Sequence, residues 1–65
     1  MRLELNGKPH DTEAATLAEL VAETGADGAA VATAHKGKFV PRNVRAETAL
    51  MPGDRIEVLS PMQGG

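Results

Sequence analysis

The sequence predicts an α+β fold in which a mixed sheet of about five strands packs on one helix. Three observations lead to this prediction. Several short segments have the alternation or composition of strands, two pairs of them are separated by tight-turn dipeptides, and a single segment has clear helical spacing. One helix must then cover all the strands, so a sheet wrapped around it is the economical arrangement. With 65 residues the chain forms one domain at most.

The chain opens with a predicted hairpin. Residues 2–5 alternate polar and apolar, which is the period of a half-buried strand, and Leu3 and Leu5 should face the core. Asn6-Gly7 is a strong signal for a type I′ turn, because that turn needs positive φ at both positions. The returning strand contains Pro9, which disfavours a central position, so we expect a short edge strand.

The helix is predicted by a capping box and an apolar stripe. Thr16 can accept a hydrogen bond from the backbone N–H of Glu19, and the Glu19 side chain can reach back to the N–H of Thr16. Gly25 is placed to end the helix in a left-handed cap. Between these two caps, an apolar stripe at helical spacing is formed by Leu17, Leu20, Val21 and Thr24.

The second half predicts a short hairpin, a loop and a final strand. Residues 29–35 are assigned to a strand because Lys36-Gly37 stands where a tight turn would, and residues 38–40 resemble the returning strand. Residues 43–50 lack clear periodicity and are assigned to a loop or one helical turn. A type II turn at 51–54 leads into the last strand, which we expect beside the first strand in the centre of the sheet.

The segment Pro61-Met62-Gln63-Gly64-Gly65 follows this strand directly and is the candidate functional site. The two glycines have no side chain, so the segment could thread a narrow enzyme channel with a bare carboxylate at its tip. Such a carboxylate becomes an acyl donor once it is joined to a nucleotide phosphate. We therefore divide the chain into a folded domain, residues 1–60, and a flexible tail, residues 61–65. A frayed terminus without function is the alternative.

Composition argues against several other classes of function. The sequence has no cysteine, which excludes a thiolate nucleophile, and its net charge of −2 argues against nucleic-acid binding by bulk attraction. No apolar run approaches the roughly 18 residues of a membrane span. The first residues lack the apolar core of a signal peptide. We expect a soluble protein of the cytoplasm.

Taken in order, several stretches resemble the sulfur-carrier proteins of thiamine biosynthesis, which share the ubiquitin-like β-grasp fold. The stretches span the chain and are Leu5-Asn6-Gly7, Thr16-Leu17-Ala18-Glu19-Leu20, Gly37-Lys38-Phe39-Val40-Pro41-Arg42, Gly53-Asp54-Arg55-Ile56-Glu57-Val58 and Met62-Gln63-Gly64-Gly65. Two positions depart from the pattern. Lys36 stands where the family usually has Asn, and Arg45 stands where an aromatic residue is common.

The resemblance implies a carrier that is a co-substrate and not an enzyme. An E1-like adenylating enzyme would use ATP to activate the carboxylate of Gly65, which would then become a thiocarboxylate. The sulfur would come from a donor of the cysteine desulfurase type, and thiazole synthase would consume it. The resemblance implies no cofactor bound to the carrier itself. We expect a monomer that forms complexes with its enzymes, without nucleic acid or membrane as partners.

Two alternatives remain open. The same chemistry could serve the molybdenum cofactor (molybdopterin), tRNA thiolation or cysteine synthesis. In a different class, the chain could be a β-grasp interaction module that binds a partner non-covalently.

Further residues are candidates for partner contact. Leu59 and Phe39 are predicted exposed apolar contacts, together with Met62, Gln63 and Gly64 of the tail. A loose basic group is assigned to solvated surface, with a docking patch for an acidic partner as the alternative; its members are Lys36, Lys38, Arg42 and Arg45. His10 and His35 are isolated from any carboxylate-rich cluster, so we predict no metal site.

Overall fold

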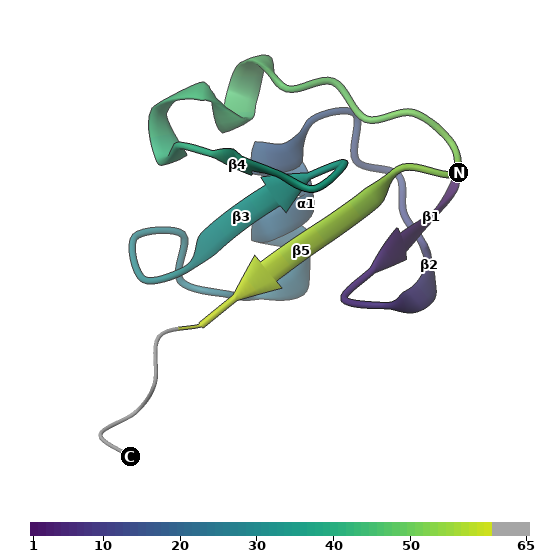
Figure 1. Ribbon diagram of the computed structural model, residues 1–65, viewed down its shortest axis with the longest axis horizontal. Helices are drawn as coiled ribbons and strands as arrows, with labels where there is room; N and C mark the ends of the chain where they lie inside the picture. The colour runs from purple at the N-terminus through teal and green to yellow at the C-terminus, as the bar shows by residue number, and fades with distance from the viewer. Residues whose placement is uncertain (61–65) are drawn as a thin grey trace.

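The computed structural model describes residues 1–60, which form one sheet, one α-helix and one 3-10 helix. The elements in chain order are β1 (Arg2–Leu5), β2 (Lys8–Asp11), α1 (Leu17–Thr24), β3 (Ala32–His35), β4 (Lys38–Val40), η1 (Arg42–Glu47) and β5 (Arg55–Leu59). Within the sheet the strand order is β2-β1-β5-β3-β4. β5 pairs parallel with β1 and antiparallel with β3, so the sheet is mixed. The predicted fold class is confirmed, with α1 covering one face of the sheet (Figure 1).

β5 is the central strand, and this position decides where the chain leaves the sheet. It lies beside β1, as the sequence predicted, and its other neighbour is β3. Ile56 of β5 pairs with Leu5 on one side and His35 on the other. β2 lies at the edge of the sheet, as predicted from Pro9, which an edge strand tolerates. Residues 61–65 would continue from this central strand, but they lie outside the residues that the structure describes.

Both hairpins close through the same kind of turn. Asn6 and Gly7 have φ values of 52° and 84°, and Lys36 and Gly37 have values of 55° and 81°. Positive φ at both central positions is the type I′ geometry, whose twist matches that of the paired strands. Both predicted turns are therefore confirmed, although Lys36 adopts a left-handed conformation that lysine disfavours.

The helix caps follow from local chemistry. The Thr16 Oγ1 accepts from the Glu19 N–H at 3.2 Å, and Gly25 ends α1 with φ 80°, as predicted. The return bond of the capping box differs by one residue, because the Glu19 carboxylate accepts from the N–H of Ala15 at 2.7 Å. Thr16 is extended at this point and forms a bridge with Ala49 of a second segment.

The expectation of a strand over residues 29–35 was wrong in its first half. β3 begins at Ala32, and a turn precedes it. Asp27 holds that turn: its carboxylate accepts from the Ala29 N–H at 3.0 Å and its carbonyl from the Ala30 N–H at 2.9 Å. This Asx turn competes successfully with strand formation. The segment expected to be a loop or one helical turn, residues 43–50, contains all of η1 except its first residue, Arg42.

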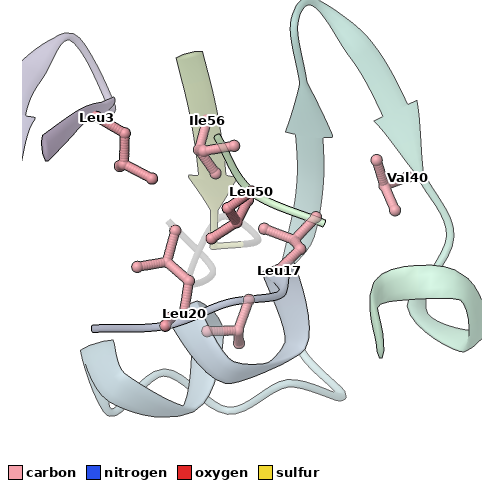
Figure 2. Close-up of a cluster of buried hydrophobic side chains, with 8 residues drawn as sticks. Leu3, Leu17, Leu20, Val40, Leu50 and Ile56 are labelled. Carbon is pink, nitrogen blue, oxygen red and sulfur yellow. The ribbon is translucent and has the colours of Figure 1, made fainter. Parts of the chain in front are cut away.

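The core lies between α1 and the sheet. Leu17 and Leu20 of α1 lie in one cluster with Ile56 of β5, and all three side chains are fully buried (Figure 2). Burying each such side chain stabilises the fold by about 2 kcal/mol. The core as a whole comprises Leu3, Ala14, Leu17, Leu20, Val21, Val40, Leu50 and Ile56. Neither helix in residues 1–60 has the length and apolar character that crossing a membrane requires.

Candidate functional site

The predicted site has two parts, and the structure describes one of them. Residues 61–65 lie outside the described chain, and with them the predicted tail and the contacts Met62, Gln63, Gly64 and Gly65. These stay predictions, as does the division of the chain at residue 60. The two other candidates, Phe39 and Leu59, lie on described strands.

Phe39 and Leu59 lie on the same face of the sheet, opposite α1. Val40 and Ile56 are buried toward the helix, so their odd-numbered neighbours Phe39 and Leu59 point the other way. Both are largely exposed, at 69% and 58%. Strand alternation therefore places two large apolar residues from separate strands on the same face of the sheet.

Two alanines of β3 lie between these large side chains. The strand register places Ala34 opposite Phe39, and Ala32 opposite Leu59. We call these four residues the outer apolar patch. Glu57 pairs with Ala34 from the β5 side, so a charged side chain borders the patch. Leu59 is the last residue of β5, so the patch reaches the point where the described chain ends. An apolar patch with a charged border has the composition expected of a protein contact surface.

Asn6 reaches from the first turn to the far part of β5. Its Oδ1 accepts from the main-chain N–H of Val58 at 2.9 Å, and its Nδ2 donates to the Val58 carbonyl at 3.2 Å. The sequence indicated Asn6 only as a turn former. The signal for a second role was available, because a primary amide carries both a donor and an acceptor and can pair with a peptide group.

Arg45 overturns the expectation of a fully solvated basic group. It is only 5% exposed, and its guanidinium donates to the Thr33 hydroxyl at 3.0 Å, the Gly28 carbonyl at 2.8 Å and the Val31 carbonyl at 2.7 Å. Arginine can be buried in this way because its planar head supplies several donors at once. Arg45 thus ties η1 to the segment before β3 and contributes no charge to the surface.

Each histidine lies against one carboxylate that is distant in sequence. His10 Nε2 lies 3.3 Å from Glu23 Oε1, and His35 Nε2 lies 2.7 Å from Asp54 Oδ2. The hydrogen bond from the Thr12 hydroxyl, and after it the contact with His10, hold the pKa of Glu23 below its usual value. No three potential ligands among His, Cys, Asp and Glu gather into a metal-binding group within residues 1–60.

A hollow of about 290 Å³ lies on the other side of the sheet, between α1 and η1. Its lining is mostly small residues, together with two arginines; the lining residues are Ala18, Val21, Ala22, Ala26, Gly28, Arg42, Arg45 and Ala46. The hollow is lined from α1, η1 and the segment before β3, whereas the outer apolar patch lies on the face of the sheet opposite α1, so the two do not adjoin.

The chain is similar to known proteins along its whole length. Residues 3–65 match the model of the ThiS family. The crystal structure of the thiamine biosynthesis protein (ThiS) from Geobacter metallireducens is 30% identical, with a TM-score of 0.83 and 100% of both chains covered. An NMR solution structure of a thiamine biosynthesis protein from the same organism is 30% identical with a TM-score of 0.81, covering 100% of this chain and 88% of that one. Curated proteins yielded no match.

Proposed function

This chain belongs to the ThiS family, and we propose that it is a sulfur carrier protein for thiamine biosynthesis whose Gly65 carboxylate carries the sulfur. The observation that supports this most is the family match over residues 3–65, which includes both terminal glycines of the sequence. The similarity to the Geobacter metallireducens protein, which covers both chains in full, supports the proposal further, because the two proteins share the same fold.

The proposed chemistry takes place at Gly65, and other proteins supply the catalytic groups. A carboxylate oxygen of Gly65 attacks the α-phosphate of ATP on an E1-like adenylating enzyme, and pyrophosphate leaves. A persulfide sulfur, formed on a donor of the cysteine desulfurase type, then attacks the carbonyl carbon and displaces AMP, which gives an acyl disulfide. A thiol reductant cleaves the S–S bond of this acyl disulfide and supplies the two electrons that bring the sulfur to the sulfide level. The product is a thiocarboxylate, from which thiazole synthase takes the sulfur. The carrier is a co-substrate in each step, and the ATP belongs to the partner's site.

The outer apolar patch is the proposed docking surface for these partners. Phe39 and Leu59 are large, exposed and apolar, and they lie on the face that α1 leaves open. Leu59 is also close in sequence to the reactive end, so a partner that holds Leu59 is well placed to receive Gly65. Met62, Gln63 and Gly64 complete the proposed contact.

Intact-mass measurement tests this proposal. The purified chain is incubated with the activating enzyme, ATP, a cysteine desulfurase, cysteine and a thiol reductant. We expect a mass increase that equals the replacement of one oxygen by sulfur, and we expect no increase when ATP is omitted. A non-covalent interaction module would keep its mass under all conditions, and that result would overturn the proposal.

The pathway is tested by the enzyme that consumes the thiocarboxylate. We expect thiazole synthase with its small-molecule substrates to return the carrier to its original mass. Molybdopterin synthase components, offered in the same way, should leave the thiocarboxylate intact. The opposite pattern would assign the carrier to the molybdenum cofactor.

A further inference from the structure

The ladder between β1 and β5 is one rung longer than the two backbones alone provide. Main-chain pairing joins Glu4 with Arg55 and Leu5 with Ile56, and the Asn6 N–H donates to the Ile56 carbonyl at 2.9 Å. Beyond this point the chain turns away into β2. The next polar groups on that edge of β5 are the N–H and the carbonyl of Val58, and the Asn6 side chain binds both.

Turn formation does not account for Asn6. The second hairpin has the same backbone conformation with Lys36 in the equivalent place. The Lys36 ammonium lies toward Asp54, at 3.9 Å, and makes no comparable contact with a strand. Asp-Gly and Gly-Gly also form type I′ turns. Among these side chains, the primary amide alone offers both the donor and the acceptor that a peptide group requires.

Without this rung, the N–H and carbonyl of Val58 would lose the partners that Asn6 provides. This end of β5 would then be held from the β3 side only, where Glu57 lies opposite Ala34 and Leu59 lies opposite Ala32. One open edge at the end of a strand invites fraying, because unpaired strand ends open at small free-energy cost. The affected residues are Val58, Leu59 and Ser60, the last ones before 61–65. They include Leu59 of the outer apolar patch.

We propose that Asn6 is a positioning residue for sulfur transfer: its side-chain amide holds Val58 in the sheet and so fixes the place from which residues 61–65 start. This inference rests on the proposed function. A reactive group whose anchor point is fixed reaches a partner's active site with less loss of conformational freedom, and the gain appears in the rate of the chemical step.

Two substitutions at Asn6 test the inference, with one matched control. Asn6→Gly keeps a type I′ turn and removes both hydrogen bonds. Asn6→Asp also keeps the turn and the acceptor, but places a carboxylate oxygen against the Val58 carbonyl. Lys36→Gly makes the same Gly-Gly turn in the other hairpin. It therefore reproduces the loss of stability that a flexible glycine causes in such a turn, while the Asn6–Val58 hydrogen bonds stay intact. Far-UV circular dichroism at the assay temperature selects the variants that are folded.

The readouts are thiocarboxylate formation by intact mass, at a series of carrier concentrations, and amide exchange. For Asn6→Gly and Asn6→Asp we expect kcat to fall by about tenfold or more while KM changes by less than about threefold. Exchange of the Val58 amide should accelerate by about tenfold, while the main-chain amide of position 6, which donates to Ile56, stays protected. Lys36→Gly should leave kcat, KM and the exchange rates of both amides near the wild-type values.

The outcomes separate this inference from the proposed function. If the wild-type chain gains sulfur and the Asn6 variants gain it with an unchanged kcat, the positioning role is wrong and the carrier function stands. An equal loss of kcat in Lys36→Gly would also overturn the inference, because it would assign the effect to the turn. If the wild-type chain gains no sulfur, both proposals fall together.

Discussion

The side chains of His35 and Asp54 lie 2.7 Å apart, Nε2 to Oδ2, and join the end of β3 to the turn that precedes β5. The Asp54 side chain is only 6% exposed. Its Oδ2 also accepts from the Met51 N–H at 2.9 Å, and its Oδ1 lies 3.9 Å from the Lys36 ammonium. One carboxylate thus connects the β3–β4 hairpin to the entry of the central strand.

This carboxylate should make stability depend on pH. Burial alone would raise the pKa of Asp54, but the hydrogen bonds with His35 and Met51 and the charges of His35 and Lys36 outweigh it and hold that pKa below its usual value. A carboxyl whose pKa is lower in the folded state stabilises the fold above its unfolded pKa, about 3.9. That contribution is lost as pH falls from about 4 through the lower, folded pKa.

The corresponding variant is Asp54→Asn, followed by urea denaturation as a function of pH. We expect it to lower the free energy of unfolding by about 1–3 kcal/mol near pH 6, with the difference from wild type shrinking below about pH 4. Asp11→Asn is the matched control, because Asp11 forms an exposed pair with Arg2 and should change stability little. A constant difference across the acid range would contradict the role of the Asp54 charge.

Replacing Arg45 should destabilise the fold. Arg45→Met removes the donors from the Gly28 and Val31 carbonyls and from the Thr33 hydroxyl, and the lost hydrogen bonds should reduce the free energy of unfolding by about 2 kcal/mol or more. Arg42→Met, on the exposed side of η1, should change it by less than about 0.5 kcal/mol. Equal stability of the two variants in urea denaturation would show that the network contributes nothing.

Lys36→Asn should stabilise the protein. Lys36 has φ 55°, a left-handed conformation that costs lysine about 1 kcal/mol and that asparagine adopts more readily. The exposed contact with Asp54 that is lost contributes little in comparison. We expect a rise in Tm of a few degrees, about 3–8 °C, for a domain of this size. Lys38→Asn, outside the turn, serves as the control; a lower Tm for Lys36→Asn would refute the argument from turn strain.

The outer apolar patch should be needed for binding to the activating enzyme. Phe39→Asp and Leu59→Asp should each raise the Kd by about tenfold or more in calorimetric titration, because a charge would have to be buried at the contact. Met51→Asp is the matched control, since Met51 is 59% exposed but lies in the turn before β5, at the opposite end of that strand from Leu59. The docking proposal fails if all three variants bind alike while remaining folded.

The features that sequence analysis predicted correctly are those that local chemistry decides. Asn6-Gly7 predicts its turn because few dipeptides accept positive φ twice, and Thr16 and Gly25 predict the ends of α1 because caps depend on adjacent backbone groups. The expected strand over 29–35 was too long because Asp27 accepts hydrogen bonds from the N–H groups of Ala29 and Ala30, which extends the turn into the expected strand.

The contacts that were missed join residues far apart in the chain. Arg45 and Thr33 are 12 residues apart, His35 and Asp54 are 19 apart, and Asn6 and Val58 are 52 apart. No local pattern marks such partners, since their meeting depends on the strand order and register. Arg45 was therefore assigned to the surface, with the other members of the basic group, because its side chain is charged, and that assignment was wrong.

The most direct measurement of the central claim is localisation of the transferred sulfur. Three chains are incubated with the activating enzyme, ATP and the sulfur donor: the wild type, a chain that lacks Gly65, and a chain extended by one alanine. The account predicts that the wild type alone exchanges one oxygen for sulfur, and that fragment masses place the exchange at Gly65. Sulfur at any other residue, or equal gain by the shortened or extended chain, would contradict it.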